Sequence, residues 1–243
     1  MFWNIRKNVK YSSGIFILSS IYKDGFSKKW RFPLERIFVV PHAFFSSHAG
    51  HNFPLPDKNP PISKKPKILI LFFGRIDAYK GMDVLISAFE KAVRKDHRLF
   101  LRVCGNGPFD QLVPKIPPDV RSHLDLDVRW IGEEEIGGIF KQADFLVLPF
   151  RAQAQSGVIA MAYAFGKPVI TSRLGGLVEQ VVDGETGLLC EPGNASDFAK
   201  KIISLSQNDT LFEKLCLGIK KRGQIYSWEN SAKIIQKAFE VQK

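Results

Sequence analysis

Two cations and a glycine lie together in a segment that directly follows an apolar run. In Phe73-Gly74-Arg75-Ile76-Asp77-Ala78-Tyr79-Lys80-Gly81, Gly74 allows another group to approach the backbone closely, and Arg75 and Lys80 carry positive charge. Lys80 stands at the positive end of the helix expected next, where its charge is unfavourable unless an anion is present. The segment therefore predicts a diphosphate site, and the alternative is a loop with two surface cations.

A second segment, Gln155-Ser156-Gly157-Val158, has the composition of a helix start. Serine is favoured at helix N-caps, and Gly157 leaves the first backbone amides uncovered. Such amides bind anions, helped by the helix dipole. Alone, the segment is typical of an ordinary capped helix. Combined with Arg75 and Lys80 on a neighbouring strand end, it predicts half of one pyrophosphate pocket.

Both segments lie in a region where strand-like and helix-like patterns alternate. The expected strands span residues 67–73, 99–104, 127–131, 144–149, 168–172 and 187–190. The expected helices span 82–95, 134–142 and 157–165, with short ones near Phe109 and Leu177 and two or three more over 195–242. This alternation predicts an α/β fold with a doubly wound, Rossmann-like parallel sheet. Ligands of such sheets bind at the carboxyl ends of the strands, where both segments fall.

Glycine pairs mark two further turns, Gly105-Asn106-Gly107-Pro108 and Gly175-Gly176. Each fits either a structural turn or a loop bordering the ligand, and the sequence leaves that choice open. The first turn is not a dinucleotide fingerprint, because a third glycine is missing and Pro108 interrupts it. That absence argues against a nicotinamide-dependent dehydrogenase.

A proline-rich stretch, residues 51–66, divides the chain. Proline fixes φ and donates no backbone hydrogen bond, so we expect an extended linker there. Before it, a strand over 13–19, a basic helix over 21–30 and a strand over 36–40 form a β-α-β piece. That piece is too small to hold a core alone.

Composition limits the remaining function classes. The formal net charge of +11 favours anionic partners, but no nucleic-acid-binding motif appears, so we expect no nucleic acid. A solvated basic surface and contact with an anionic membrane both stay open. No apolar run reaches the roughly 20 residues that a membrane-spanning helix needs. Cys104, Cys190 and Cys216 lie in apolar strings and are expected to be buried free thiols of a cytoplasmic protein.

Together these segments resemble the C-terminal domain of family 4 glycosyltransferases, which have the GT-B fold. The resemblance rests on Phe73-Gly74-Arg75 through Lys80-Gly81, Cys104 through Pro108, Gly166-Lys167-Pro168-Val169, Gly175-Gly176 with Glu179, and Asp183-Gly184 with Thr186-Gly187-Leu188-Leu189. Their order and spacing extend over about residues 67–198. Ser227-Trp228-Glu229 is similar to the family's closing segment, and Val39-Val40-Pro41-His42 to its hinge approach, with Ala43 in place of the usual glycine.

The resemblance implies a hexosyltransferase-type enzyme that transfers a glycosyl group from a nucleotide-diphosphate sugar. It further implies a retained anomeric configuration, no metal or other cofactor, and a role in polysaccharide biosynthesis. Arg75 and Lys80 would neutralise the diphosphate and the departing nucleotide. The other implied donor-binding residues are Gly74, Gly132, Ile136, Gln155, the Ser156, Gly157 and Val158 amides, and Glu179, which would support the Gly175-Gly176 turn.

The resemblance also implies a division of the chain. Residues 1–50 would be a remnant of the N-terminal acceptor domain, 51–66 the linker, 67–225 the nucleotide-sugar-binding domain and 226–243 a C-terminal helix. Catalysis in such enzymes needs two lobes closed on the substrates. We therefore expect this chain to need a separate acceptor-binding lobe, as a fragment or as part of a split enzyme. Alone it would bind the donor in the cytoplasm, or against the inner membrane face, with little turnover.

One departure from the family pattern leaves two hypotheses. The family commonly has two glutamates eight positions apart, and Gln153 and Met161 stand in their places. An amide can still bond sugar hydroxyls, whereas Met161 cannot accept a hydrogen bond from a ribose. The chain is then either a transferase domain with altered donor contacts or a catalytically inactive nucleotide- or partner-binding module of the same fold.

Two other patterns are interpreted as non-functional. Asp125-Leu126-Asp127 matches a metal-binding motif of another glycosyltransferase fold, but it lies at the start of an expected strand, away from the ligand edge. His42, His48 and His51 have no cysteine or carboxylate at a matching spacing. We therefore predict no metal site.

Overall fold

The computed structural model describes residues 8–43, 60–109, 116–152, 155–223 and 225–240. The chain divides into two compact units. The large unit is Phe45–Arg222, and the small unit combines Met1–Phe44 with Gly223–Lys243.

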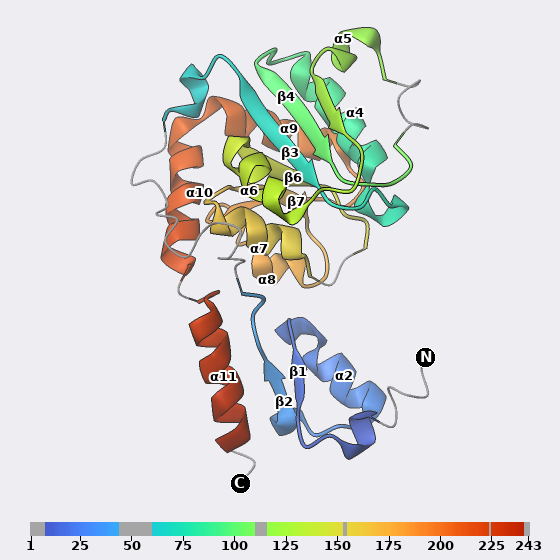
Figure 1. The fold of residues 1–243 in the computed structure, drawn as a ribbon, viewed down its shortest axis with the longest axis vertical. Coiled ribbons are helices and arrows are strands. Elements are labelled where there is room, and N and C mark those ends of the chain that lie inside the picture. The colour runs from blue at the N-terminus through green and yellow to red at the C-terminus, as the bar shows by residue number, and fades with distance from the viewer. Residues whose placement is uncertain (1–7, 44–59, 110–115, 153–154, 224, 241–243) are drawn as a thin grey trace. The chain divides into compact units, whose positions relative to one another are not determined.

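A parallel six-stranded sheet forms the centre of the large unit (Figure 1). Its strands are β3 (Ile68–Phe73), β4 (Leu99–Cys104), β5 (Leu124–Asp127), β6 (Phe145–Leu148), β7 (Val169–Ser172) and β8 (Gly187–Cys190). Their order is β5-β4-β3-β6-β7-β8, and every neighbouring pair is parallel. The predicted α/β fold with a doubly wound parallel sheet is thereby confirmed.

Helices connect these strands and cover both faces of the sheet. They are α4 (Met82–Val93), α5 (Pro118–Arg121), α6 (Glu133–Gln142), α7 (Gly157–Ala164), α8 (Leu177–Gln180), α9 (Ala195–Gln207) and α10 (Asp209–Arg222). Right-handed crossovers that run in opposite directions from the middle of the sheet place α4 and α7 on opposite faces. The central strand is consequently apolar on both sides, and all its residues from Ile68 to Phe72 are buried.

The strand β5 lies three residues earlier than the sequence predicted. Leu124 and Leu126 pair with β4, and the strand ends at Asp127. The expected strand over 127–131 was wrong because Arg129 pairs with Asp127 and Glu135, and Trp130 is 79% exposed. Near the expected short helix, Phe109 is buried but not helical, and residues 110–115 lie outside the described chain.

The end of the expected linker belongs to the large unit. Ile62 lies in the 3-10 helix Ile62–Lys64, is fully buried and packs near α9 and α10. The amide and hydroxyl of Ser63 donate to Asp209 at 2.8 and 2.6 Å, and Lys65 forms an ion pair with Asp144. Residues 60–66 are therefore anchored and do not form an extended linker, while residues 51–59 lie outside the described parts.

The small unit contains a parallel pair of strands, β1 (Ile15–Ile17) and β2 (Ile37–Val39), with Ile15 opposite Ile37. The helix α2 (Lys23–Trp30) packs over the pair through a cluster of buried and half-buried apolar residues that includes Phe26 and Ile37. The helix α11 (Trp228–Glu240) lies beside β2. The C-terminal helix thus groups with the N-terminal segment, which the sequence did not indicate.

None of the helices in the described ranges is both long enough and apolar enough to cross a membrane.

Candidate functional site

The strand order defines a single switch point in the sheet. From β3 the chain winds outward through β4 and β5, and from β6 it winds the other way through β7 and β8. In such sheets the ligand crevice lies at the carboxyl ends of the two strands where the order reverses. The two segments singled out by the sequence follow these two strands, because Gly74–Gly81 comes after β3 and Gln155–Val158 comes after β6.

The backbone of the first segment lies against the start of α7. Gly74 has a φ of +116°, and a Cβ added to it would lie 3.8 Å from Cγ2 of Val158. The amide of Gly74 donates to the Cys104 carbonyl at 3.0 Å, which fixes the loop to the end of β4. The structure thus places Gly74 next to Val158 at the carboxyl ends of β3 and β6.

The turn Gly105–Gly107, which follows β4, packs against the backbone of this loop. Gly105 and Gly107 have φ values of +135° and +143°. A Cβ on Gly105 would overlap the Gly74 carbonyl, and one on Gly107 would overlap the carbonyl of Ile76. Because only glycine avoids both the strain and the overlap, a structural role accounts for these two glycines.

Lys80 belongs to the loop after β3, but its side chain is buried against the chain that leaves β6. It ends the 3-10 helix Ala78–Lys80, and only 7% of its surface is exposed. Its Nζ lies 4.3 Å from the ring centre of Phe150, just after β6, and 5.0 Å from that of Tyr79. No carboxylate among the described residues pairs with it. Aromatic faces offset only part of the cost of burying a cation, so this position favours an anionic ligand.

Gly81 and Tyr79 explain why Lys80 reaches β6. A Cβ on Gly81 would overlap the carbonyl oxygen of Pro149, so the absence of a side chain permits this close approach. The Tyr79 carbonyl accepts a hydrogen bond of 2.7 Å from the Arg151 amide. The loop after β3 is therefore joined to the chain leaving β6.

Arg75 differs from Lys80 in its surroundings. Its side chain is 71% exposed, and its Nε lies 3.3 Å from Oδ2 of Asp77. Exposed ion pairs contribute little stability, so this guanidinium can exchange its partner at small cost. Arg75 is thus an exposed charge with a weakly held partner, whereas Lys80 is a buried charge held between aromatic rings.

The start of α7 departs from the prediction in one respect. Ser156 is the N-cap residue and is 3% exposed, but its hydroxyl does not cap the helix and bonds no described group. Its amide donates to Oε1 of Gln180 at 2.8 Å. The expectation that this amide is available for phosphate was wrong, because the amide is already occupied. The next two amides, of Gly157 and Val158, find no acceptor within the described chain.

The remaining predicted donor-binding residues that the structure describes lie on α6, α7 and α8 or directly before these helices. Met161 is buried in α7, Gln155 is half-buried just before it, and Glu179 is half-buried in α8. Gly132 precedes α6, where its amide donates to Glu135 at 3.0 Å, and Ile136 is buried in the first turn. Gln153 lies outside the described residues.

Sequence reasoning missed Gln180. It ends α8, is 5% exposed, and bonds the backbone of Ser156 through both ends of its side-chain amide. The family pattern draws attention to its neighbour Glu179, and no local signal distinguishes Gln180 from a surface glutamine. Only its burial in the fold reveals the contact.

The acidic motif and the histidines give no metal site in the described parts of the chain. The motif does not lie at the start of β5 as expected, since Asp127 ends that strand. Asp125 pairs with Arg102 at 2.6 Å and Asp127 with Arg129 at 2.7 Å. His48 and His51 are outside the described residues, and no described cluster of three or more His, Cys, Asp or Glu could hold a metal ion.

The predicted buried free thiols are confirmed for all three cysteines. Burial raises the pKa of Cys104 and of Cys216 to about 12, and it raises the pKa of Cys190 as well. Since the thiolate is the reactive form, none of these residues is suited to nucleophilic chemistry.

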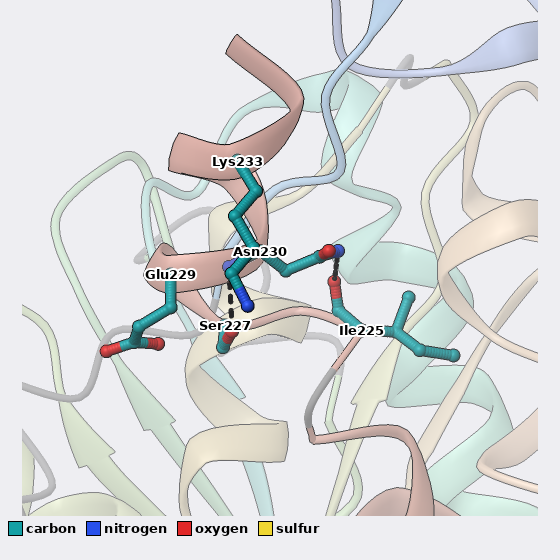
Figure 2. Close-up of a pocket in the computed structure, with 5 residues that line it drawn as sticks. All are labelled: Ile225, Ser227, Glu229, Asn230 and Lys233. Carbon is teal, nitrogen blue, oxygen red and sulfur yellow. Dashed lines mark hydrogen bonds between the residues drawn. The ribbon is translucent and has the colours of Figure 1, made fainter. Parts of the chain in front are cut away.

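A pocket in the small unit lies at the start of α11 (Figure 2). Ile225, Ser227, Glu229, Asn230 and Lys233 line it. The Asn230 amide donates to the Ser227 hydroxyl at 3.0 Å, and the Asn230 side chain donates to the Ile225 carbonyl at 2.7 Å. These bonds close the N-terminus of the helix, so we assign the residues a capping role.

The large unit is thus an α/β domain whose doubly wound parallel sheet carries a buried cation and open helix amides at its switch point. Residues 67–208 match the family described as Glycosyl transferases group 1. The chain belongs to this family, and its fold is that of the GT-B glycosyltransferases.

Curated relatives include an uncharacterized glycosyltransferase of Methanocaldococcus jannaschii. It is 32% identical over 171 residues, which cover 70% of this chain and 47% of the relative. A D-inositol 3-phosphate glycosyltransferase of Corynebacterium aurimucosum is 30% identical over 172 residues, covering 68% of this chain and 41% of the relative. The chain thus spans about half the length of the curated relatives it matches.

Solved structures show the same fold. A point mutant of TarM from S. aureus, in complex with Fondaparinux, α-GlcNAc-glycerol and UDP, has a TM-score of 0.76 at 20% identity, covering 98% of this chain and 46% of TarM. HepE of Anabaena, in complex with UDP and glucose, has a TM-score of 0.75 at 17% identity, covering 99% of this chain and 65% of HepE.

Proposed function

We propose that this chain is the donor-binding part of a hexosyltransferase-type glycosyltransferase that uses a nucleotide-diphosphate sugar. One observation carries the proposal. A buried lysine without a carboxylate partner and the unbonded amides of Gly157 and Val158 stand on the two loops that meet at the switch point, within the part of the chain that the structure describes. A diphosphate is the ligand that satisfies both.

The chemistry follows from where charge develops. As the bond between the sugar and the nucleotide diphosphate breaks, negative charge accumulates on the departing phosphate oxygens. The buried Lys80, the exposed Arg75 and the open amides of α7 would stabilise that charge. With cations in this position the reaction needs no metal ion, and the family resemblance implies a retained anomeric configuration.

Other residues of the proposed site would hold the rest of the donor. Gly132 and Ile136 would border the nucleobase, and Glu179 would support the Gly175-Gly176 turn. Gln155 would border the phosphates next to the α7 amides, and Gln153 would bond sugar hydroxyls. Met161 is buried in α7 and offers the ribose no hydrogen-bond acceptor. We therefore propose a donor site with fewer ribose contacts than the family pattern provides.

The acceptor side of the reaction would come from a second lobe, in the same protein or on a partner chain. The chain spans about half the length of its relatives, which supports this proposal. We further propose a role in polysaccharide biosynthesis at the cytoplasmic side of a membrane. The sequence of the small unit holds eleven Lys and Arg against four Asp and Glu, a balance suited to peripheral contact with anionic lipid.

A second candidate is a catalytically inactive nucleotide- or partner-binding module. The replacement of a family glutamate by Met161 favours it. An inactive nucleotide-binding module would share the diphosphate site and differ from the transferase only in turnover, so a transfer assay with the second lobe present separates these two. A partner-binding module would bind no nucleotide, which a donor-binding test detects.

Donor binding tests the proposal directly. We expect UDP, GDP or ADP, or one of their sugar derivatives, to raise the melting temperature of the full chain. Lys80→Ala should abolish the shift and Arg75→Ala should reduce it, because each removes a charge that faces the diphosphate. Lys200→Ala, which removes an exposed cation of α9, is the matched control and should bind like the wild type. The proposal fails if no nucleotide shifts the melting temperature of the wild type.

A further inference from the structure

The helix start of the proposed donor site is held by a side chain from another helix. Gln180 closes α8, and its amide group pairs with both backbone polar groups of Ser156. We infer that Gln180 is a positioning residue for diphosphate binding, which sets the Ser156-Gly157 peptide so that the Gly157 and Val158 amides face the crevice. This inference rests on the proposed function.

The contact is a two-point pairing. Oε1 of Gln180 accepts from the Ser156 amide at 2.8 Å, and Nε2 donates to the Ser156 carbonyl at 3.1 Å. The same carbonyl accepts the first bonds of α7, from Ile159 at 3.2 Å and Ala160 at 3.4 Å. Because both backbone groups of Ser156 are held, the residue cannot rotate without breaking buried hydrogen bonds.

This arrangement replaces the usual way of starting a helix. A serine N-cap normally turns its hydroxyl back onto an amide of the first turn and thereby occupies that amide. The Ser156 hydroxyl makes no such bond. Gln180 fixes the entry of the chain from outside the helix instead, and it consumes only the Ser156 amide. The first turn is thus rigid while the Gly157 and Val158 amides stay available.

A purely structural role of Gln180 would predict a different effect on phosphate affinity. If Gln180 only joined α8 to α7, its loss would lower stability and leave phosphate affinity unchanged. Thr186 offers a matched control for that case. It is fully buried, and its hydroxyl oxygen accepts two hydrogen bonds, from Tyr163 at 2.8 Å and from the Val182 amide at 3.0 Å.

The test compares Gln180→Met and Thr186→Val in the full chain. Both substitutions keep the approximate size of the side chain and remove two hydrogen bonds, both buried for Gln180 and one buried and one part-buried for Thr186. Binding of inorganic pyrophosphate and of UDP, GDP and ADP is measured by calorimetry, well below the melting temperature of each variant. We expect Gln180→Met to bind pyrophosphate, and the nucleotide that the wild type prefers, about tenfold more weakly. Thr186→Val should stay within about twofold of the wild type.

The outcomes separate the two proposals. Equal affinities in Gln180→Met and Thr186→Val, with a wild type that binds, overturn the positioning role and leave the donor site standing. A wild type that binds neither pyrophosphate nor any of the nucleotides overturns both.

A measurement on the wild type covers the case in which Gln180→Met does not fold. In an amide NMR titration with pyrophosphate, the Gly157 and Val158 protons should move downfield as they form new hydrogen bonds. The Ser156 amide and the Gln180 side-chain amide should keep their positions. A Ser156 shift as large as that of Gly157 would contradict the inference, since that amide would then serve the ligand.

Discussion

The sheet of the large unit has an amino edge, where its parallel strands begin, and a carboxyl edge, where they end. The buried polar groups at these two edges differ in whether they have hydrogen-bond partners. At the amino edge, Asp144 accepts from Lys65 and from the Leu69 amide, and Asp209 accepts from Ser63. At the carboxyl edge, Lys80 faces aromatic rings and no described carboxylate. The hydroxyls of Ser156 and Ser172 are also buried at this edge, and neither has a hydrogen-bond partner in the described chain.

This difference supports the proposal that the carboxyl edge binds the ligand while the amino edge serves stability. Buried polar groups in folded proteins are almost always bonded, so a concentration of unbonded ones needs an explanation. A ligand that supplies the missing partners is the simplest one at the switch point of a doubly wound sheet. The amino edge, with its groups satisfied internally, serves as the fixed base of the domain.

The largest effect is expected from breaking the amino edge. Asp144→Ala leaves Lys65 and the buried Leu69 amide without their acceptor, and we expect it to cost about 3 kcal/mol of unfolding free energy. Urea denaturation measures this loss. Nucleotide affinity should be unchanged in the folded variant. A loss of affinity equal to that of the Lys80 variant would show that the two edges are not separate.

At the carboxyl edge we expect a substitution to raise the unfolding free energy instead of lowering it. Lys80→Met replaces a buried cation that lacks a carboxylate in the described chain by an apolar side chain of similar length. We expect it to stabilise the ligand-free protein by about 1 kcal/mol while diphosphate binding is lost. Urea denaturation without nucleotide provides the measurement. A destabilised variant would mean that the aromatic contacts of Lys80 outweigh the cost of burying its charge.

The smallest expected effect is a pH dependence of the stability that Asp209 contributes. Hydrogen bonds from the Ser63 hydroxyl and amide hold the pKa of Asp209 below its usual value. A depressed pKa contributes stability above the pKa of the unfolded state, about 4, and that contribution is lost as the pH falls through the folded value. Asp209→Asn should therefore be less stable than the wild type at pH 7, and the difference should vanish in stronger acid. Urea midpoints across this range measure it, and a constant difference would contradict the assignment.

Strongly patterned elements could be predicted from the sequence. The ranges expected for β4 and β8 agree with the structure, because continuous apolar runs bounded by turn residues permit little else. The edge strand β5 was misplaced, since Leu124 and Leu126 alternate with aspartates that resemble a loop. The anchoring of Ser63 could not be foreseen, because its partner Asp209 lies 146 residues away.

The site shows the same limit on a smaller scale. Spacing indicated that Gly74, Lys80 and Gly157 belong together, and the structure places their segments on adjoining loops. It could not indicate which amides are free, because that depends on Gln180, 24 residues from Ser156. Patterns along the chain brought these segments together at the proposed donor site, whereas hydrogen bonds between distant segments determine which backbone amides there remain available.

The anchored segment before β3 has a consequence for exchanging domains between transferases. Ile62, Ser63 and Lys65 are bound to the amino edge, although the prolines around them suggest a dispensable tether. A chimera joined at residue 67 would discard these contacts and expose the surface they cover. A junction ahead of residue 60 keeps them, so the natural unit of recombination begins within the proline-rich stretch and not after it.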